Sequence, residues 1–304
     1  MRKSVRIGKV TVELSNLDKV LFPDDGITKG ELVEYYRKVA GHMLPYLADR
    51  PVSMQRFPDG IGKEGFYQKS ISDYFPDWID RVEVPKEGGT VTHVVCQDAA
   101  TLVYLANQGC ITPHVWLSRK DRIRHPDRMI FDLDPSGDDF GAVRSAARTL
   151  RELLDELGLA PYVMTTGGRG LHVVTPLDRS ADFDDVRAFA RDAADLLARR
   201  QPGRLTTETR KNKRRGRIFL DYLRNAWAQT AVPPFAVRAR KGAPVAMPLG
   251  WDELGRAVSG SAYHVGNAFR RLGRADDPWR GMARRARSLS KPRRKLDALI
   301  EEER

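Results

Sequence analysis

The most regular hydrophobic pattern lies in the second half of the chain. Apolar residues recur at helical spacing in two stretches, and short apolar runs typical of strands lie around them. The order is β-α-β-β-α-β, which predicts an α/β (α+β) fold with one sheet, helices on one of its faces, and the other face free to carry a site. The predicted helices span 139–157 and 182–200, and the predicted strands span 128–134, 161–166, 171–176, a short run near Leu205, and 217–223.

The first half mixes short strand-like runs with many turn residues. One helix is predicted to begin at Thr28, which can cap it together with Glu31, and Pro45 and Pro51 follow as punctuation. A second helical stretch, 98–109, ends at a glycine. This half therefore looks like a platform beside the more regular core.

Composition narrows the class of protein. A chain of 304 residues with 41% hydrophobic content can bury a real core, and its formal charge of +12 favours polyanionic partners, nucleic acid first. A high-GC genome is the alternative source of such an arginine surplus. Cys96 and Cys110 lack metal-binding or disulfide spacing, and neither a signal peptide nor a long apolar run is present. We expect a cytoplasmic, nucleoid-associated protein without membrane contact.

Two acidic residues share one predicted strand. In the run Met129–Asp134, the i, i+2 spacing of Asp132 and Asp134 points both carboxylates to one face. Carboxylates held that close repel each other unless a cation lies between them, so the pattern favours a divalent-metal site. The alternative is a strand that simply ends in a turn, since Pro135 and Gly137 follow.

A third carboxylate, Asp221, lies in the middle of a second apolar strand, where an unpaired charge is costly. Pairing with Arg217 or Arg224 is the structural alternative. Together with Asp132 and Asp134, however, Asp221 completes the donor set that two-metal phosphoryl transfer uses.

A glycine-rich turn, Thr166–His172, joins two strands of the same predicted core. Its glycines let backbone N–H groups approach a phosphate closely, and Thr166, Arg169 and His172 add a hydroxyl and two further donors. Most such hairpins are only turns. His114, ahead of the first acidic strand, is a second candidate triphosphate contact, although a histidine beside a tryptophan is more often a packing residue.

These motifs, in this order, resemble the polymerase domain of bacterial ligase D, a member of the archaeo-eukaryotic primase superfamily. The resemblance covers about residues 10 to 290. It rests on Asp132-Leu133-Asp134, the Thr166–His172 turn, Leu220-Asp221-Tyr222, and the runs at 16–23, 65–69 and 225–230.

The resemblance implies a template-dependent polymerase of non-homologous end joining that fills short gaps at broken DNA ends and prefers ribonucleotides. It implies two divalent ions, Mn²⁺ or Mg²⁺, and a nucleotide triphosphate and 5′-phosphorylated DNA as ligands. A Ku-like end-binding protein and a separate ligase are implied partners if the chain works alone, because it ends near the limit of the family domain. By role, the matching positions are Asp132, Asp134 and Asp221 for metal and catalysis; His114, Thr166, Arg169, His172 and, more weakly, Arg238 for the triphosphate; Lys19 and Lys29 for the 5′-phosphate; and Phe66 and Tyr67 for stacking on the template.

Thr166 departs from the family's more usual serine, but its hydroxyl is retained. The loop 210–217, with six basic residues among eight, is a candidate path for the template backbone, or simply a solvated loop. The predicted organisation is a single primase-like domain, 1–290, with an N-terminal lobe (1–110), a catalytic core (111–240) and a C-terminal extension (241–290). A charged segment, 291–304, follows as a solvated helix or tail.

Two other classes fit the same residues. A two-metal nuclease could use the three aspartates but has no need of the glycine-rich turn with His172. A non-catalytic nucleic-acid-binding module could use the same core without any metal.

Overall fold

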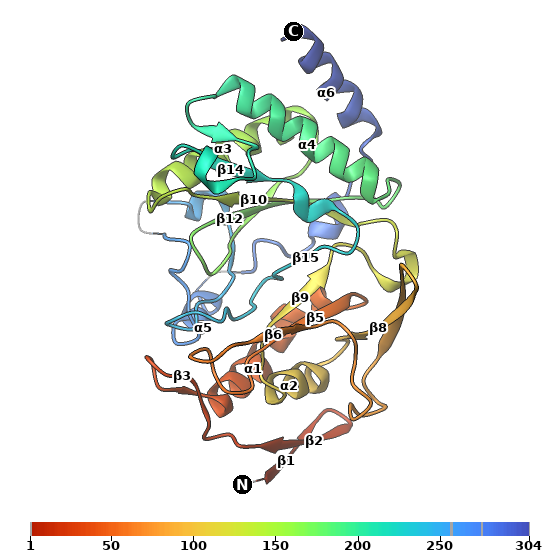
Figure 1. Cartoon of the computed structure of the whole chain (residues 1–304), viewed down its shortest axis with the longest axis vertical. Helices are drawn as coiled ribbons and strands as arrows, with labels where there is room; N and C mark the ends of the chain where they lie inside the picture. Colours follow the sequence, from red (N-terminus) through yellow and green to blue (C-terminus); the bar gives the residue numbers. More distant parts are fainter. Residues whose placement is uncertain (1, 256–257, 275, 304) are drawn as a thin grey trace. The chain divides into compact units, whose positions relative to one another are not determined.

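The computed structural model describes residues 2–255, 258–274 and 276–303, so Met1 and Arg304, which bound the predicted domain and tail, lie outside the described residues. The chain forms two compact units, each assembled from separate stretches (Figure 1). The first unit comprises Met1–Asp121, Thr230–Met247 and Tyr263–Ala275, and the second comprises Arg122–Gln229, Pro248–Ala262 and Asp276–Arg304.

The first unit is built on a sheet with strand order β15-β9-β5-β8-β7, in which β6 also pairs with β5. Helices α1 and α2 pack against each other, and two separate strand pairs, β1 with β2 and β3 with β4, complete the unit. Its elements are β1 (Arg2–Ile7), β2 (Val10–Ser15), β3 (Val20–Phe22), β4 (Ile27–Thr28), α1 (Lys29–Leu47), β5 (Pro51–Arg56), β6 (Phe66–Gln68), β7 (Arg81–Lys86), β8 (Gly89–Val95), α2 (Ala99–Asn107), β9 (Cys110–Trp116), β15 (Thr230–Ala231) and α5 (Ala268–Leu272).

The start of α1 follows from its capping sequence. Thr28 accepts a hydrogen bond from the backbone N–H of Glu31, and the Glu31 carboxylate accepts one from the backbone N–H of Thr28, which is the predicted capping box. Pro45 does not end the helix, contrary to its predicted role as punctuation, because α1 continues to Leu47. A proline in the last turn removes one backbone donor without stopping the chain from completing that turn.

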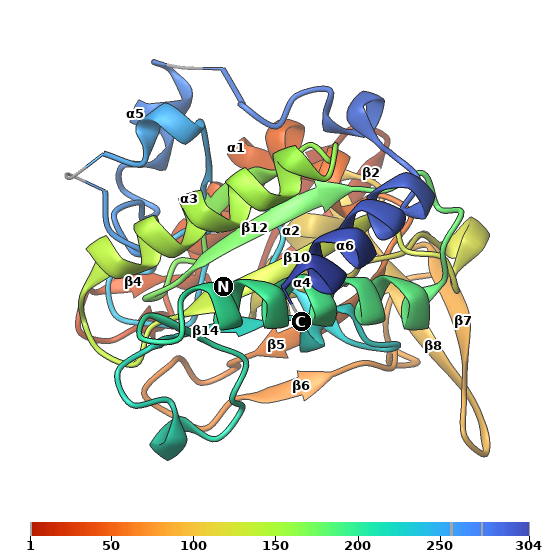
Figure 2. The same ribbon diagram turned by 90° about the horizontal axis from the view of Figure 1, so that it is seen from above.

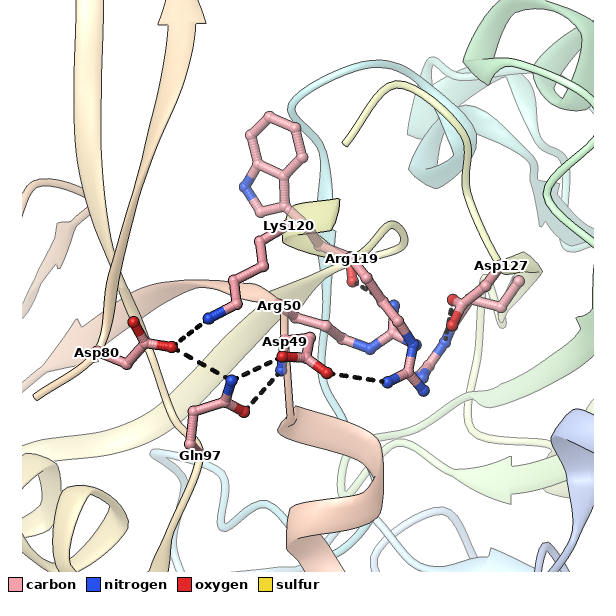
Figure 3. A network of polar contacts seen from close by, with 9 residues as sticks. Asp49, Arg50, Asp80, Gln97, Arg119, Lys120 and Asp127 are labelled. Carbon is pink, nitrogen blue, oxygen red and sulfur yellow. Dashed lines mark hydrogen bonds and ion pairs between the residues drawn. The ribbon is translucent and has the colours of Figure 1, made fainter. Parts of the chain in front are cut away.

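A polar network in the first unit ties the end of α1 to the sheet (Figure 3). The Gln97 side-chain amide donates to Asp49 Oδ1 at 2.6 Å and to Asp80 Oδ2 at 3.2 Å. Lys120 binds the same Asp80 carboxylate, and Arg119 lies 3.6 Å from Asp49. The network therefore links chain segments that are far apart in the sequence.

The second unit is built on a sheet with strand order β13-β14-β10-β12-β11-β16. All neighbours pair antiparallel except β13 and β14, which are parallel. Its helices and strands are β10 (Arg128–Asp134), α3 (Phe140–Glu156), β11 (Tyr162–Thr165), β12 (Leu171–Pro176), α4 (Phe183–Arg200), β13 (Leu205–Thr206), β14 (Ile218–Asp221), β16 (Pro248–Leu249) and α6 (Ser290–Glu302). Short 3₁₀ turns lie at η1 (Lys120–Arg122), which spans the boundary between the units, and at η2 (Lys211–Lys213), η3 (Leu223–Asn225), η4 (Trp251–Glu253) and η5 (Met282–Arg285).

The split βαβ order predicted from the sequence is confirmed in this unit. Helices α3 and α4 lie across one face of the sheet, and both contact β10 (Figure 2). Along β10, Phe131 and Leu133 are fully buried and alternate with Asp132 and Asp134, so the two carboxylates point to the opposite face. The fold thus leaves one face of the sheet to polar side chains.

One strand is shorter than its apolar pattern predicts. β14 ends at Asp221, and the chain then turns into η3 because the backbone N–H of Leu223 donates to Asp221 Oδ1 at 2.8 Å. Asp221 is therefore the last residue of the strand and partly exposed, whereas the sequence suggests a position in the middle of a buried strand.

The last helix, α6, packs on α4. Leu296 is fully buried, and the Arg293 guanidinium lies over the Phe189 ring and donates to Asp192 at 2.8 Å. Across the described residues, no helix is both long and apolar enough to cross a membrane.

Candidate active site

Three carboxylates meet on the polar face of the second unit's sheet. Asp132 and Asp134 lie two residues apart on β10, and Asp221 on β14 is the direct cross-strand partner of Asp132. Cross-strand partners point to the same face, so the three side chains converge. One oxygen from each lies within 4.8 Å of the others.

Burial makes this cluster electrostatically strained. It raises the pKa of Asp134, and repulsion from Asp132 and Asp221 raises it further. Burial also raises the pKa of Asp221, with the Asp132 charge adding to it and the hydrogen bond from Leu223 opposing it. The cluster therefore favours a positive charge among its oxygens.

Arg224 partly meets that demand. Its Nε lies 3.6 Å from Asp132 Oδ2 and 3.9 Å from Asp221 Oδ2, so one of the two arginines considered from the sequence does pair with the cluster. The other, Arg217, instead donates to the backbone carbonyl of Arg214 at 2.9 Å. Sequence reasoning treats Arg224 only as a structural partner, although its position three residues after Asp221 is the signal that it can reach the site.

His172 extends the row of polar residues across the sheet. On β12 it pairs directly with Asp132, and its Nε2 lies 3.5 Å from Asp132 Oδ2. The side chain is buried, and within the described residues no hydrogen-bond partner reaches its Nδ1. Asp221, Asp132 and His172 thus stand side by side on three adjacent strands.

The glycine-rich turn between β11 and β12 is held close to the carboxylates. A Cβ at Gly170 would lie 2.5 Å from the Leu133 carbonyl oxygen, so only glycine lets the turn approach β10 this closely. Gly167 has a positive φ of 64°. The Thr166 hydroxyl donates to the Gly170 carbonyl at 3.1 Å, which fixes the shape of the turn from within.

The cationic side chains near this turn differ in how exposed they are and in how firmly other residues hold them. Arg169 is exposed and lies 3.6 Å from Asp138. In the basic loop 210–217, Arg214 is buried, stacks on Phe219 with its guanidinium 4.0 Å from the ring centroid, and donates to the Glu208 carbonyl. Arg214 thus anchors the loop. The residues of this loop that remain exposed are Arg210, Lys211, Asn212, Lys213, Arg215 and Gly216.

The remaining predicted site residues belong to the first unit. His114 lies on β9 with Tyr67 of β6 against it, the ring centroids being 5.5 Å apart. Phe66, the neighbour of Tyr67, is exposed and has the Arg56 guanidinium 5.5 Å from its ring centroid. Arg238 is partly exposed, and its backbone N–H donates to the Pro244 carbonyl.

Lys29 is the first residue of α1, and its backbone N–H donates at 2.8 Å to the carbonyl of Lys19, which lies directly before β3. The Lys29 ammonium is buried and donates to the Asn107 carbonyl at 3.1 Å, and burial, with the nearby Lys19 charge, lowers its pKa. The Lys19 ammonium is more exposed and pairs with Asp59, with 2.5 Å between Nζ and Oδ1. The structure therefore brings the two lysines together and adds a carboxylate that the sequence does not indicate.

The donor set of the acidic cluster suits a hard divalent cation. Its three residues offer only carboxylate oxygens, the ligands that Mg²⁺ and Mn²⁺ prefer. Arg224 offsets only part of the negative charge, and burial together with repulsion among the carboxylates raises the pKa of Asp134 and of Asp221. Asp132, Asp134 and Asp221 therefore fit a divalent-metal site.

Comparison with known proteins gives a consistent result. A family model described as the LigD primase-polymerase domain matches residues 28–279. The chain is 34% identical over 246 residues to the multifunctional non-homologous end joining protein LigD of Mycolicibacterium smegmatis, covering 80% of this chain and 32% of that protein. It is 31% identical over 270 residues to the bifunctional LigD of Bacillus subtilis, covering 88% of this chain and 43% of that one.

A solved structure agrees with these matches. The polymerase domain from Mycobacterium tuberculosis ligase D, in complex with DNA, superposes with a TM-score of 0.84 at 30% identity, covering 90% of this chain and 98% of that domain. Against the curated relatives above, in contrast, the chain spans between 32% and 43% of their length.

Proposed function

The chain belongs to the LigD primase-polymerase domain family and is therefore a nucleotidyltransferase of the polymerase type. From this starting point we propose the following reaction. The chain extends the 3′ end of a primer opposite a template strand at short gaps or broken DNA ends, and it prefers ribonucleotides. The pathway is non-homologous end joining or a related gap repair.

The observation that carries this proposal is the convergence of Asp132, Asp134 and Asp221 on one face of the sheet. Nucleotide addition needs a site where an attacking 3′-hydroxyl and a triphosphate meet, both of them negatively charged in the transition state. A carboxylate cluster beside a glycine-rich turn supports such a site.

The three aspartates would hold two divalent ions, Mn²⁺ or Mg²⁺. When bound, these ions supply activation of the primer 3′-hydroxyl and neutralisation of the triphosphate charge. The pairing of β10 with β14 fixes the spacing of the three aspartates, so it would also fix the positions of the ions that they hold. His172 and Arg224, both close to Asp132, supply further positive or donor groups on the same face.

The triphosphate is proposed to lie along the glycine-rich turn. Arg169 is exposed and can turn from Asp138 to a phosphate, and His172 presents a buried ring beside Asp132. Thr166 holds the turn through its bond to Gly170 and offers its hydroxyl oxygen as a further contact. For His114 and Arg238, which belong to the first unit, the proposed role as triphosphate contacts rests on the family resemblance alone.

DNA is proposed to contact the exposed cations and rings. Lys19 and Lys29 form a pocket for the 5′-phosphate at the far side of a gap, and two positive charges near enough to influence each other favour an anion beside them. Phe66 is exposed enough to stack on a template base. The exposed part of the basic loop follows the template backbone.

The proposed partners follow from the relatives. Those proteins are named for non-homologous end joining, in which ends are brought together and sealed. A Ku-like end-binding protein and a DNA ligase activity would therefore act on the same DNA ends as this chain.

A primer-extension assay tests the proposal. A labelled primer on a gapped, 5′-phosphorylated duplex is incubated with ribo- or deoxynucleotides in Mg²⁺ or Mn²⁺. Lengthening of the primer, greater with ribonucleotides, is expected. Shortening without extension would instead indicate a nuclease, and binding without any reaction under either metal would indicate a non-catalytic module.

A further inference from the structure

The Lys19 side chain of the proposed phosphate pocket already has an anionic partner. Asp59 lies 40 residues further along the chain, and its Oδ1 is 2.5 Å from the Lys19 ammonium. This hydrogen bond, with the Lys19 charge, lowers the pKa of Asp59. The carboxylate is therefore negatively charged at every pH at which a DNA 5′-phosphate would compete with it for Lys19. Both side chains are exposed, at 39% for Lys19 and 71% for Asp59, and are thus accessible to a ligand.

The loop that carries Asp59 is fixed beside Lys19. The backbone N–H of Ile61 donates to the Leu21 carbonyl at 2.8 Å, and Phe57 is bonded in the same way to Gly109. At Gly60, which has φ of 82°, an added Cβ would lie 2.9 Å from the Leu21 oxygen. The loop therefore packs directly on β3, the strand that begins next to Lys19, and this holds Asp59 near the ammonium.

The backbone at the start of α1 offers no alternative anion ligand. The N–H groups of Lys29 and Gly30 donate to the carbonyls of Lys19 and Leu17, each at 2.8 Å. The N–H of Glu31 donates to the Thr28 hydroxyl. These first-turn donors are satisfied, so a phosphate at this position depends on the two ammonium groups.

We propose that Asp59 is an intramolecular competitor that weakens the hold of this pocket on the 5′-phosphate. The proposal rests on the proposed function of Lys19 and Lys29. A phosphate that binds Lys19 must displace the Asp59 carboxylate and then tolerate a negative charge beside it. The charge of Lys63 also lowers the pKa of Asp59, so a second cation is available to the carboxylate once Lys19 binds the phosphate.

Weakened binding suits the chemistry of the substrate. In a gap, the 5′-phosphate is needed again once synthesis is complete, because sealing the strand consumes it. A pocket of moderate affinity positions the gap and then releases this group to a phosphodiester-forming reaction at another site.

The test measures affinity for gapped duplexes with and without the 5′-phosphate, by fluorescence anisotropy at fixed ionic strength. Asp59→Asn keeps the shape of the side chain and removes its charge. It is expected to tighten binding of the phosphorylated gap roughly two- to fivefold, the range of an exposed ion pair, and to leave the other gap unchanged. Asp24→Asn is the matched control, because Asp24 forms a comparable exposed pair with Lys241 at 3.6 Å.

The Lys19→Ala variant tests the phosphate pocket separately from the competitor role of Asp59. It should weaken binding of the phosphorylated gap only. In its background Asp59→Asn should have a smaller effect than in the wild type, because no ion pair has to be displaced and only the repulsion between the carboxylate and the phosphate remains. If Lys19→Ala acts as stated but Asp59→Asn changes nothing, or acts no differently from Asp24→Asn, the competitor role is wrong and the pocket stands. If Lys19→Ala with Lys29→Ala affects both gaps equally, the pocket itself is wrong.

Discussion

Tyr67 and His114 lie edge to face, with 5.5 Å between their ring centroids and 61° between their planes. The neighbouring residue on β6, Phe66, instead lies beside Arg56. Successive residues of a strand point to opposite faces, so Phe66 and Tyr67 have different neighbours although both side chains are exposed. This relationship divides a pair that the sequence assigns to a single role.

We predict that the two aromatic residues affect different substrates. Phe66→Ala should weaken binding of template DNA by about tenfold or more, because one base loses its stacking partner. Tyr67→Ala should instead raise the KM for the nucleotide roughly two- to tenfold, since it releases His114 from an aromatic contact. Steady-state kinetics with varied nucleotide, alongside DNA-binding titrations, checks both. Tyr67→Phe, which keeps the ring, is the control, and equal effects of both alanine variants on DNA binding would contradict the division.

The acidic cluster gives the second prediction. Asp134→Ala should lower primer extension by more than about a hundredfold, because several kcal/mol of charge stabilisation depends on the donor set. Binding of DNA should persist, since Asp134 repels rather than attracts a polyanion. Asp155→Asn, on the exposed surface of α3, where Asp155 pairs with Arg151 of the same helix, provides a control of equal charge change. Extension at the wild-type rate by the Asp134 variant would exclude this residue from the metal site.

The sequence predicts the strands that carry these carboxylates for a physical reason. Apolar runs fix the strands, and alternation along β10 then fixes the face on which Asp132 and Asp134 lie. The segments that carry Asp221 and His172 are also predicted as strands of the same core. That both residues pair directly with Asp132 depends on strand order and register, which only the structure gives.

Other features depend on contacts that no local pattern encodes. The pairing of Lys19 with Asp59 joins residues 40 apart through a loop packed on β3. The end of β14 at Asp221 depends on a side-chain hydrogen bond to Leu223, although the apolar run continues past it. The different neighbours of Phe66 and Tyr67 similarly follow from strand pairing. Side-chain partners of this kind are set by tertiary packing.

Acid should weaken the polar network of the first unit shown in Figure 3. Burial alone would raise the pKa of Asp80, but its bond to Lys120 and that residue's charge outweigh this and lower the pKa. A lowered folded-state pKa adds stability above the unfolded pKa of about 3.9, and this stability is lost as pH falls through the folded value. Asp80 is 38% exposed, so its share should stay below about 1 kcal/mol.

The measurement for Asp80 is the free energy of unfolding by denaturant between pH 7 and pH 3. Asp80→Asn should lower the free energy of unfolding at pH 7. It should also make this free energy depend less on pH at the acid end of the range. Asp77→Asn serves as the control, because Asp77 is fully exposed and lies 3.9 Å from Arg81. An unchanged acid dependence in the Asp80 variant would show that other carboxylates dominate it.

The close approach of the glycine-rich turn to β10 gives the last prediction. Gly170→Ala would place a methyl group 2.5 Å from the backbone oxygen of Leu133, a contact that backbone atoms must move to relieve. Such overpacking costs about 1–3 kcal/mol. It would also shift Thr166 and His172 relative to Asp132, so a fall in kcat together with a raised nucleotide KM is expected beside a lower Tm. At Gly137, in contrast, a Cβ meets nothing within 4 Å, so Gly137→Ala should leave all three values nearly unchanged. A Gly170 variant with lower Tm but wild-type kinetics would mean that the turn stabilises the fold without positioning the triphosphate.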